Sequence, residues 1–219
     1  MKKQIVLAFD IERSGGTAEY ETIGIGASVV SSEFEELDSI FLPNYYPGIT
    51  KFEPKCWNEF WCKFPEKLEI LKYDGPLSSQ EREKEVITKF QEFRKKWEIY
   101  AKENGFSYYI VSDNNVYDGG FINDMIFKHL PTSLPIPYSA SDGEYSSYFE
   151  THSMQRGFLM SEDKSFDSNW GLVKRINEIY EIPESVKKHD HNPSNDAYTI
   201  AFEMQVLFNI QNGNISKRN

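Results

Sequence analysis

Cysteine is scarce in this 219-residue chain, which has only Cys56 and Cys62. Two cysteines six positions apart make no disulfide framework, and with only four histidines in the chain they give no zinc-site spacing. We therefore expect both thiols to be reduced, in a protein of a reducing compartment. Long apolar runs are also missing, since none reaches the ~18 residues of a membrane span. The N-terminus leads straight into an apolar strand, so we expect no signal peptide, an intracellular, cytoplasmic protein and no membrane partner.

Positive charge is in deficit as well. The chain has 24 Lys and Arg against 34 Asp and Glu, which gives a net charge of −10 at pH 7. Binding along an extended duplex needs a broad basic face, and this composition argues against one. An acidic protein can still hold the end of a strand where metal ions cancel some of its acids.

Apolar and aromatic residues are sufficient for one core. They make up 39% and 15% of the chain, so disorder is excluded by composition. We expect a single domain over residues 1–219, with a frayed tail from about 211 to 219. Internal repeats and linkers are not visible in the sequence.

The order of apolar patterns predicts an α/β fold, with a mixed sheet of a three-stranded meander plus parallel strands flanked by helices. Strands are expected at 4–12, 22–31, 34–43 and 106–112, with a short one within 145–154. Helices are expected at 54–64, 79–104, 117–130, 170–180 and 193–210, and a Pro/Ser-rich loop at 131–143. A strand after a long helix is typical of a crossover, so the strand at 106–112 should lie parallel to the first. The basic run Arg94-Lys95-Lys96 is expected on a solvated helix face.

The first strand, Ile5 to Glu12, ends in two acids. Its apolar run predicts a strand buried on both faces. Side chains alternate along a strand, so Asp10 and Glu12 point the same way, about 6–7 Å apart. Two carboxylates this close repel each other unless a cation such as Mg²⁺ or Mn²⁺ lies near them. An ordinary solvated strand end is the alternative interpretation.

Further acids and a histidine follow downstream. Asp118 opens the helix after the strand at 106–112, so it should lie beside Asp10 and Glu12 if the two strands are parallel neighbours. His191 comes just before the last helix, and Asp196 lies within its first turns. Carboxylates with a titratable base beside them suit two-metal phosphodiester hydrolysis, in which the histidine takes the proton of a water.

Three segments carry a resemblance to a known family. They are Phe9-Asp10-Ile11-Glu12, Asn114-Asn115-Val116-Tyr117-Asp118, and His191 followed at +5 by Asp196. In order and spacing they resemble the three motifs of the DEDDh 3′–5′ exonucleases, which include polymerase proofreading subunits, ribonuclease T and oligoribonuclease. The resemblance spans residues 9–196.

The resemblance implies a ribonuclease-H-like fold and a metal-dependent exonuclease. Asp10, Glu12, Asp118 and Asp196 would hold two Mg²⁺ or Mn²⁺ ions, and Glu12 and His191 would be catalytic, with His191 as the general base. The expected partner is the 3′ end of single-stranded RNA or DNA, from which nucleoside 5′-monophosphates are released. His189 fits the motif spacing less well, and we expect it to be solvated. A protein partner or a homodimer stays open.

The same resemblance assigns substrate contacts to Ile11, Arg13, Ser14 and Asn114. Arg13 stands where many members have serine or threonine, so it either contacts a phosphate or balances the nearby acids. Ser14 or local backbone N–H groups are expected to meet the terminal sugar. Many members have histidine directly before Asn114, whereas this chain has Asp113. Asp113 lies too early in the motif to be its metal ligand.

Two alternatives stay open at this point. In the predicted helix 54–64, the residues Trp57, Phe60, Trp61 and Phe64 form an aromatic stripe that serves as core, as a lid or as a base-stacking platform. The alternative function is a catalytically silent module that binds a nucleic-acid-processing protein. The presence of all five expected groups argues against that second function.

Overall fold

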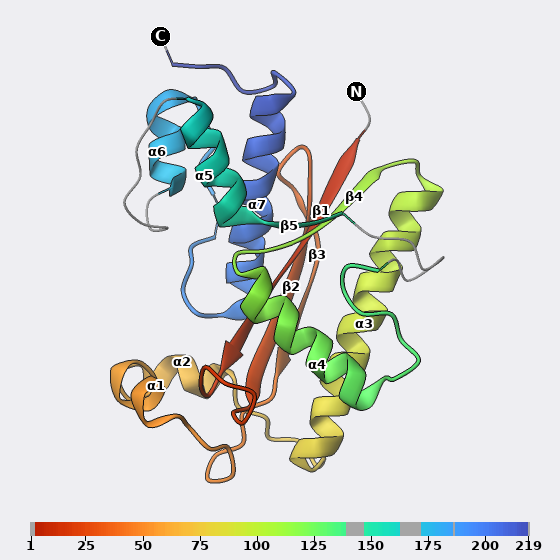
Figure 1. Cartoon of the computed structure of the whole chain (residues 1–219), viewed down its shortest axis with the longest axis vertical. Helices are drawn as coiled ribbons and strands as arrows, with labels where there is room; N and C mark the ends of the chain where they lie inside the picture. The colour runs from red at the N-terminus through yellow and green to blue at the C-terminus, as the bar shows by residue number, and fades with distance from the viewer. Residues whose placement is uncertain (1–2, 139–146, 163–171, 186, 219) are drawn as a thin grey trace.

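A five-stranded mixed sheet with the strand order β3-β2-β1-β4-β5 forms the centre of the molecule (Figure 1). The computed structural model describes residues 3–138, 147–162, 172–185 and 187–218. The strands are β1 (Gln4–Arg13), β2 (Thr22–Ser31), β3 (Glu36–Pro43), β4 (Ser107–Ser112) and β5 (Ser147–Glu150). Strand β2 is antiparallel to both of its neighbours, β1 and β3, and β4 and β5 run parallel to β1. The predicted mixed α/β sheet is confirmed, and its layout is consistent with a ribonuclease-H-like one.

Helices cover both faces of the sheet (Figure 1). Helices α3 (Ser79–Glu103) and α4 (Gly120–His129) pack on one face, and α5 (Thr151–Ser161), α6 (Leu172–Ile179) and α7 (Pro193–Gln211) on the other. None of the helices among the described residues is long and apolar enough to cross a membrane. As expected, both cysteines carry free thiols.

Strand β1 contributes to both cores, as its continuous apolar run predicts. Its odd-numbered residues, among them Phe9, pack towards α3 and α4, whereas Val6 and Ala8 pack towards α7. Because side chains alternate along a strand, Asp10 and Glu12 continue the row of Val6 and Ala8. Both acids therefore face the side of the sheet that α7 covers.

Helix α3 begins with a capping box. The hydroxyl of Ser78 accepts a hydrogen bond from the backbone N–H of Glu81, whose carboxylate accepts one from the N–H of Ser78. The prediction of a solvated basic run on this helix is wrong for Arg94. Its guanidinium is buried and donates to the Leu134 carbonyl (2.9 Å) and to the Gln91 side chain (2.8 Å).

The prediction of one continuous helix over residues 54–64 is wrong. The chain forms α1 (Pro54–Glu59), a 3₁₀ turn at Trp61–Lys63 and α2 (Pro65–Ile70). Phe60 leaves the helical conformation, with φ of −131° and ψ of −76°, and Pro65 starts a new helix because it lacks an N–H to continue the old one. The aromatic residues therefore do not share one helix face.

Two further expectations differ from the structure near the C-terminal half. Strand β5 ends at Glu150, and the following residues form α5, because the Glu150 carboxylate accepts a hydrogen bond from the Ser153 N–H (2.8 Å) and caps that helix. The predicted tail does not hang free, since Lys217 pairs with Tyr180 and the Arg218 N–H donates to the Ile179 carbonyl. Residues 139–143 of the predicted loop, 145–146 of the predicted strand, 170–171 of the predicted helix and 219 lie outside the described residues.

Candidate metal centre

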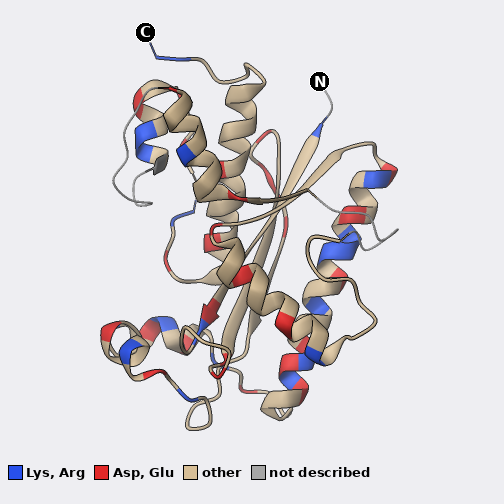
Figure 2. Ribbon diagram, viewed as in Figure 1, with Lys and Arg blue, Asp and Glu red and all other residues tan. Residues whose placement is uncertain are grey.

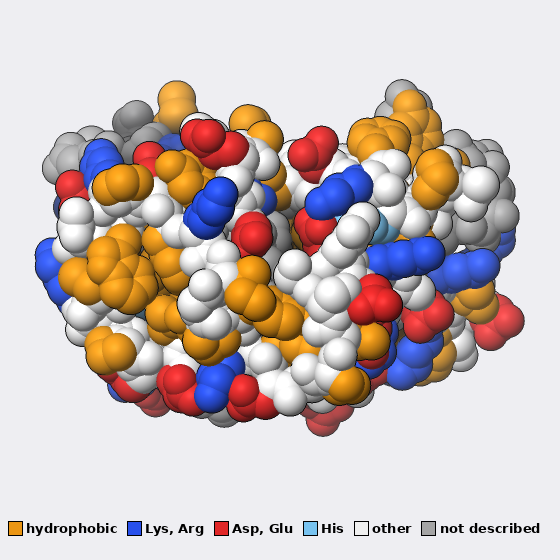
Figure 3. Space-filling view, turned by 90° about the horizontal axis from the view of Figure 1, so that it is seen from below, with side chains coloured by type: hydrophobic (Ala, Val, Ile, Leu, Met, Phe, Trp, Pro, Cys, Tyr) orange, Lys and Arg blue, Asp and Glu red, His pale blue; other side chains and the backbone are white. Residues whose placement is uncertain are grey.

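The carboxyl ends of the three parallel strands meet at one edge of the sheet, where open α/β sheets commonly bind ligands. Asp10 and Glu12 come from the end of β1, and Asp113 and Asp118 from the segment after β4. Figure 2 shows acidic residues where β1 ends and where α4 begins. A cleft of about 670 Å³ opens here. Seen from below, this face is hollowed, with acidic side chains and a histidine beside the hollow (Figure 3).

The acids form two groups that share one member. One oxygen each from Asp10, Glu12 and Asp196 lie within 4.8 Å of one another, and the same holds for Asp10, Asp113 and Asp118. The four predicted ligands are thus brought together from β1, the start of α4 and the start of α7. Asp113, which the sequence pattern set aside, joins them.

Gly26 of β2 lets α7 approach the sheet closely enough to deliver Asp196. A Cβ atom at this position would lie 2.0 Å from the carbonyl carbon of Pro193 and 2.1 Å from the backbone nitrogen of Ser194. The helix starts at Pro193, and the side chain of Asn192 caps it by accepting from the Ser194 N–H (3.1 Å). The first turn of α7 therefore rests directly on the backbone of β2.

The Asp196 carboxylate is fixed by the loop that precedes its helix. Its two oxygens accept hydrogen bonds from the backbone N–H groups of Asp190 (2.8 Å) and His191 (3.0 Å). Burial raises the pKa of this carboxyl to about 6, although the backbone bond and the nearby His189 oppose the shift. Asp196 is thus oriented before any cation binds.

Asp118 lies in a π-helical turn, Asn115–Gly119, that opens α4. The side chain of Asn114 caps this turn by accepting from the Tyr117 N–H (3.2 Å). Such turns often mark functional sites because they re-aim a side chain that a regular helix would turn away. The Oδ2 atom of Asp118 is buried and has no hydrogen-bond partner among the described residues.

Burial and mutual repulsion make the negative charges of this site unfavourable on their own. Burial raises the pKa of Asp10 well above its ordinary value, and the neighbouring Glu12 and Asp118 raise it further. Burial, followed by the nearby Asp113, does the same to Asp118. A bound divalent cation removes both penalties, and an all-oxygen donor set with a buried oxygen lacking a donor suits Mg²⁺ or Mn²⁺. The residues present therefore fit such ions.

His191 lies beside the acids, as expected. Its backbone has a positive φ of 60°, uncommon for a residue other than glycine, and its Nδ1 lies 3.6 Å from Oε1 of Glu12. This contact raises the pKa of His191 against the opposing effect of burial. His189, expected to be solvated, is exposed but also lines the cleft, with its Nδ1 3.4 Å from Oδ1 of Asp196. Two histidines therefore flank the centre.

The placement of Arg13 does not support the predicted phosphate contact. Its guanidinium is buried, donates to the hydroxyl of Thr22 (3.0 Å) and lies 3.3 Å from the ring centroid of Phe121. The carboxylates whose charges act on the pKa of Arg13 are those of Asp124 and Glu83, not those of Asp10 and Glu12. Arg13 stabilises the turn after β1.

Ser14 also belongs to that turn. It is fully buried, and its hydroxyl both donates to the carbonyl of Glu21 (3.3 Å) and accepts from its N–H (3.0 Å). A contact between the Ser14 side chain and a terminal sugar is therefore not supported. The other two predicted substrate residues, Ile11 and Asn114, do line the cleft.

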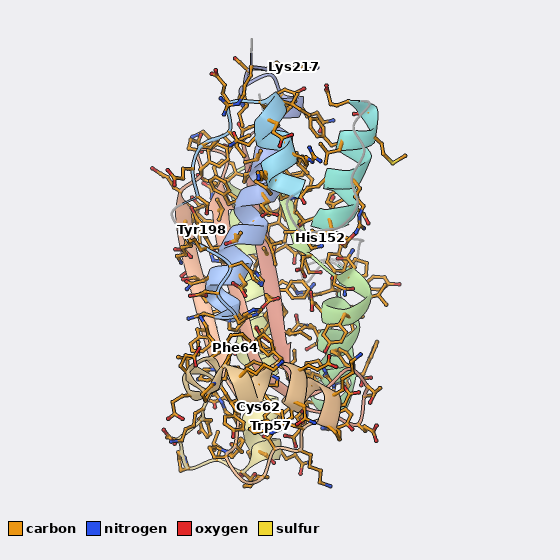
Figure 4. The ribbon with its side chains drawn as sticks, turned by 90° about the vertical axis from the view of Figure 1, so that its left-hand side faces the viewer. Trp57, Cys62, Phe64, His152, Tyr198 and Lys217 are labelled. Carbon is orange, nitrogen blue, oxygen red and sulfur yellow. The ribbon has the colours of Figure 1, made fainter. Side chains whose placement is uncertain are left out.

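Helix α5 brings side chains to the cleft that the sequence pattern did not identify. His152, Ser153 and Arg156 all line it, and Arg156 is the single Lys or Arg among the described lining residues. Figure 4 labels His152 at the start of α5. The sequence offered one signal for them: His152 and Arg156 are four positions apart, so they lie close together on one face if the segment is a helix. The sequence pattern predicts a short strand within residues 145–154 instead, and residues four apart on a strand do not lie close together.

The aromatic residues of the α1–α2 segment have separate roles. Trp61 is buried, and its indole N–H donates to the carbonyl of Arg13 (3.0 Å), which ties the segment to the end of β1. Phe60 packs edge-to-face against the ring of His191, with 4.6 Å between centroids. Trp57 and Phe64, both labelled in Figure 4, are 38% and 40% exposed and do not line the cleft described above. The core interpretation thus holds for Trp61.

A scan against protein-family models gives no match for this chain, and a search of curated proteins gives none either. The chemistry open to the site is therefore inferred from its residues: oxygen ligands for two neighbouring cations, a histidine beside one of them, and an arginine on the cleft wall.

Proposed function

We propose that this protein is a divalent-metal-dependent 3′–5′ exonuclease. It hydrolyses the terminal phosphodiester bond at the 3′ end of single-stranded RNA or DNA and releases nucleoside 5′-monophosphates. The observation that carries this proposal is the sharing of Asp10 by two groups of three carboxylates, which suits two adjacent cations. The resemblance of the three motifs to the DEDDh exonucleases supports the same reaction.

The residues of the centre divide the work of hydrolysis. Two divalent cations, when bound, lower the pKa of a water and stabilise charge on the leaving oxygen. His191 accepts a proton from the attacking water, whose oxygen bonds to phosphorus as the P–O3′ bond breaks. Glu12 holds the Nδ1 side of His191 and raises the pKa of that ring, which leaves Nε2 as the proton acceptor. The departing O3′ takes a proton from solvent water, so the shortened strand leaves with a 3′-hydroxyl.

The shape and charge of the molecule favour strand ends over long polymers. A cleft of about 670 Å³ has the size of a small-ligand site rather than a long groove. The net charge of −10 opposes binding of a polyanion along an extended surface. Arg156 is the cleft residue best suited to contact a phosphate.

The decisive test compares Asp118→Asn with Asp124→Asn. Asp118 is buried in the centre, whereas Asp124 is an exposed acid on the same helix, outside the cleft. Single-stranded RNA and DNA oligomers labelled at the 5′ end are incubated with Mg²⁺, Mn²⁺ or EDTA. We expect a one-nucleotide ladder that requires metal, falls by at least about 100-fold in Asp118→Asn and stays unchanged in Asp124→Asn.

Two results would contradict the proposal. One is a ladder that persists in EDTA or in Asp118→Asn at the wild-type rate. The other is the absence of hydrolysis of either substrate by folded, metal-loaded protein, which would favour the silent binding module. The faster of the two substrates identifies the class of nucleic acid.

A further inference from the structure

We propose that Asp113 is a ligand of a divalent cation that Asp10 and Asp118 also bind. One of the two cation positions then consists of three aspartates, one of them outside the four-carboxylate set that the motif resemblance implies. This inference deepens the proposed function and rests on it for its catalytic role, while the cation site itself is tested without turnover.

The geometry brings the three side chains to one point from two segments. Asp113 directly follows Ser112, the last residue of β4, and Asp118 follows five residues later, across the π-helical turn. Both lie at the edge of the sheet where β1, the strand of Asp10, ends. One oxygen from each of Asp10, Asp113 and Asp118 lie within 4.8 Å of one another.

A second observation, independent of the clustering, indicates a missing partner. The Oδ2 atom of Asp118 is buried in a side chain only 3% exposed, and no described residue donates a hydrogen bond to it. A buried carboxylate oxygen without a donor is costly, and a cation between the three carboxylates would pair all of them.

A comparison of the two groups of carboxylates shows why a third acid matters for this cation. The group of Asp10, Glu12 and Asp196 already offers three carboxylates, one of them oriented by two backbone N–H groups. Without Asp113, the other position has only Asp10 and Asp118. Mg²⁺ and Mn²⁺ bind more tightly as carboxylate ligands replace waters, so Asp113 should raise the affinity of the second cation.

The test measures Mn²⁺ binding by the full chain. Wild type, Asp113→Asn and the exposed control Asp124→Asn are titrated with Mn²⁺ by calorimetry and by electron paramagnetic resonance. Crystals grown with Mn²⁺ supply the positions from anomalous scattering. We expect two Mn²⁺ per chain in the wild type, one of them about 2.0–2.4 Å from oxygens of Asp10, Asp113 and Asp118. Asp113→Asn should weaken that ion by about 10- to 100-fold and leave the other in place.

Each other outcome has a defined meaning. Equal Mn²⁺ binding by Asp113→Asn and wild type, or a Mn²⁺ ion held by Asp10 and Asp118 with Asp113 out of bonding distance, overturns the inference. Absence of Mn²⁺ from the whole centre overturns both the inference and the proposed function. Mn²⁺ bound by Asp113 in a protein that hydrolyses no oligonucleotide leaves the inference standing and removes the exonuclease. If the protein is an active exonuclease and Asp113→Asn binds Mn²⁺ like the wild type, the exonuclease stands and the inference about Asp113 fails.

Discussion

Asp118 and Asp196 face the same cleft, but their carboxylates have different partners. Asp196 accepts two backbone hydrogen bonds, whereas Oδ2 of Asp118 accepts none from the described residues. Burial raises the pKa of both side chains. At the scale of single residues, the protein thus orients both oxygens of one carboxylate by its own backbone and leaves one buried oxygen of the other without a donor among the described residues.

Arg156 is the residue we expect to control substrate affinity. It lines the cleft from α5, and a guanidinium can bind phosphate oxygens through two parallel hydrogen bonds. Replacing it by glutamine should raise the KM for oligonucleotides by about 10-fold, the equivalent of about 1.4 kcal/mol, with a smaller change in kcat. Arg175→Gln, on the exposed surface of α6, is the control. An unchanged KM in Arg156→Gln would exclude this role.

Glu203 of α7 is a partly buried acid that belongs to neither group of three carboxylates, although the charge of Asp113 also acts on it. Gln155 donates to its carboxylate (2.7 Å), and burial raises its pKa to about 7. Because this folded-state pKa lies above the unfolded value, the stability it contributes is present below about pH 4.5 and is lost as the pH rises through about 7.

We therefore expect Glu203→Gln to be more stable than the wild type at pH 8, by about 1–2 kcal/mol, with little difference at pH 5. The gain is less than the full pKa shift implies because the side chain keeps partial contact with water. Urea unfolding at both pH values measures it, with the exposed Glu92→Gln as control. Equal stability of Glu203→Gln and wild type at pH 8 would show that burial does not penalise this charge.

At the scale of elements, the seating of α7 on β2 decides whether the fourth predicted ligand reaches the centre. The two backbones touch at Gly26, with no room for a side chain between them. Trp61 makes a second attachment, since its bond to the Arg13 carbonyl ties the α1–α2 segment to β1. The centre is thus held between two docked elements rather than within one.

Gly26→Ala should separate α7 from β2. The new Cβ would meet backbone atoms of Pro193, which cannot rotate away, so we expect a loss of about 1–3 kcal/mol in stability. Mn²⁺ binding should weaken as well, because Asp196 moves with its helix. Gly157→Ala, whose Cβ would meet nothing within 4 Å, is the matched control. Wild-type stability and Mn²⁺ affinity in Gly26→Ala would contradict this account of how α7 docks.

At the scale of the whole molecule, a chain of negative net charge carries a small cleft lined by several acids. The net charge of −10 gives no long-range attraction for a polyanion, so neither a long strand nor a duplex gains much by spreading over the surface. If the proposed function is correct, we expect binding to be concentrated in the cleft, where bound cations would cancel the local charge.

We expect short substrates to be processed at least as well as long ones. The kcat/KM for oligomers of about two to five nucleotides should equal or exceed that for strands of about 30. Raising the salt from about 50 to 200 mM should lower kcat/KM by far less than the ~10³-fold expected for six or more phosphate contacts. A steep salt dependence together with a preference for long strands would indicate an extended binding surface that charge alone does not reveal.

Local patterns in the sequence were sufficient for the class of fold and for the four acids at its edge. The apolar run before Asp10 and the alternation that places Glu12 beside it are short-range features, and the order of the elements indicated the parallel pairing of β4 with β1. The structure has all three. Predictions failed where a local pattern had two outcomes. The aromatic residues within 54–64 have helical spacing, but Pro65 directly after them starts a separate helix. The chain after Glu150 forms a helix because the Glu150 carboxylate caps it by accepting from the Ser153 N–H.

Only the tertiary structure decided which side chains share the site. Asp113 precedes its motif and Arg13 follows another, so spacing along the chain favoured Arg13 as a functional residue and set Asp113 aside. The fold reverses this, because the turn after β1 buries the guanidinium of Arg13 while the end of β4 aims Asp113 at Asp10. A sequence determines which groups lie near one another along a strand or helix. Which groups meet across elements depends on how strands pair and helices dock, as Gly26 shows for α7.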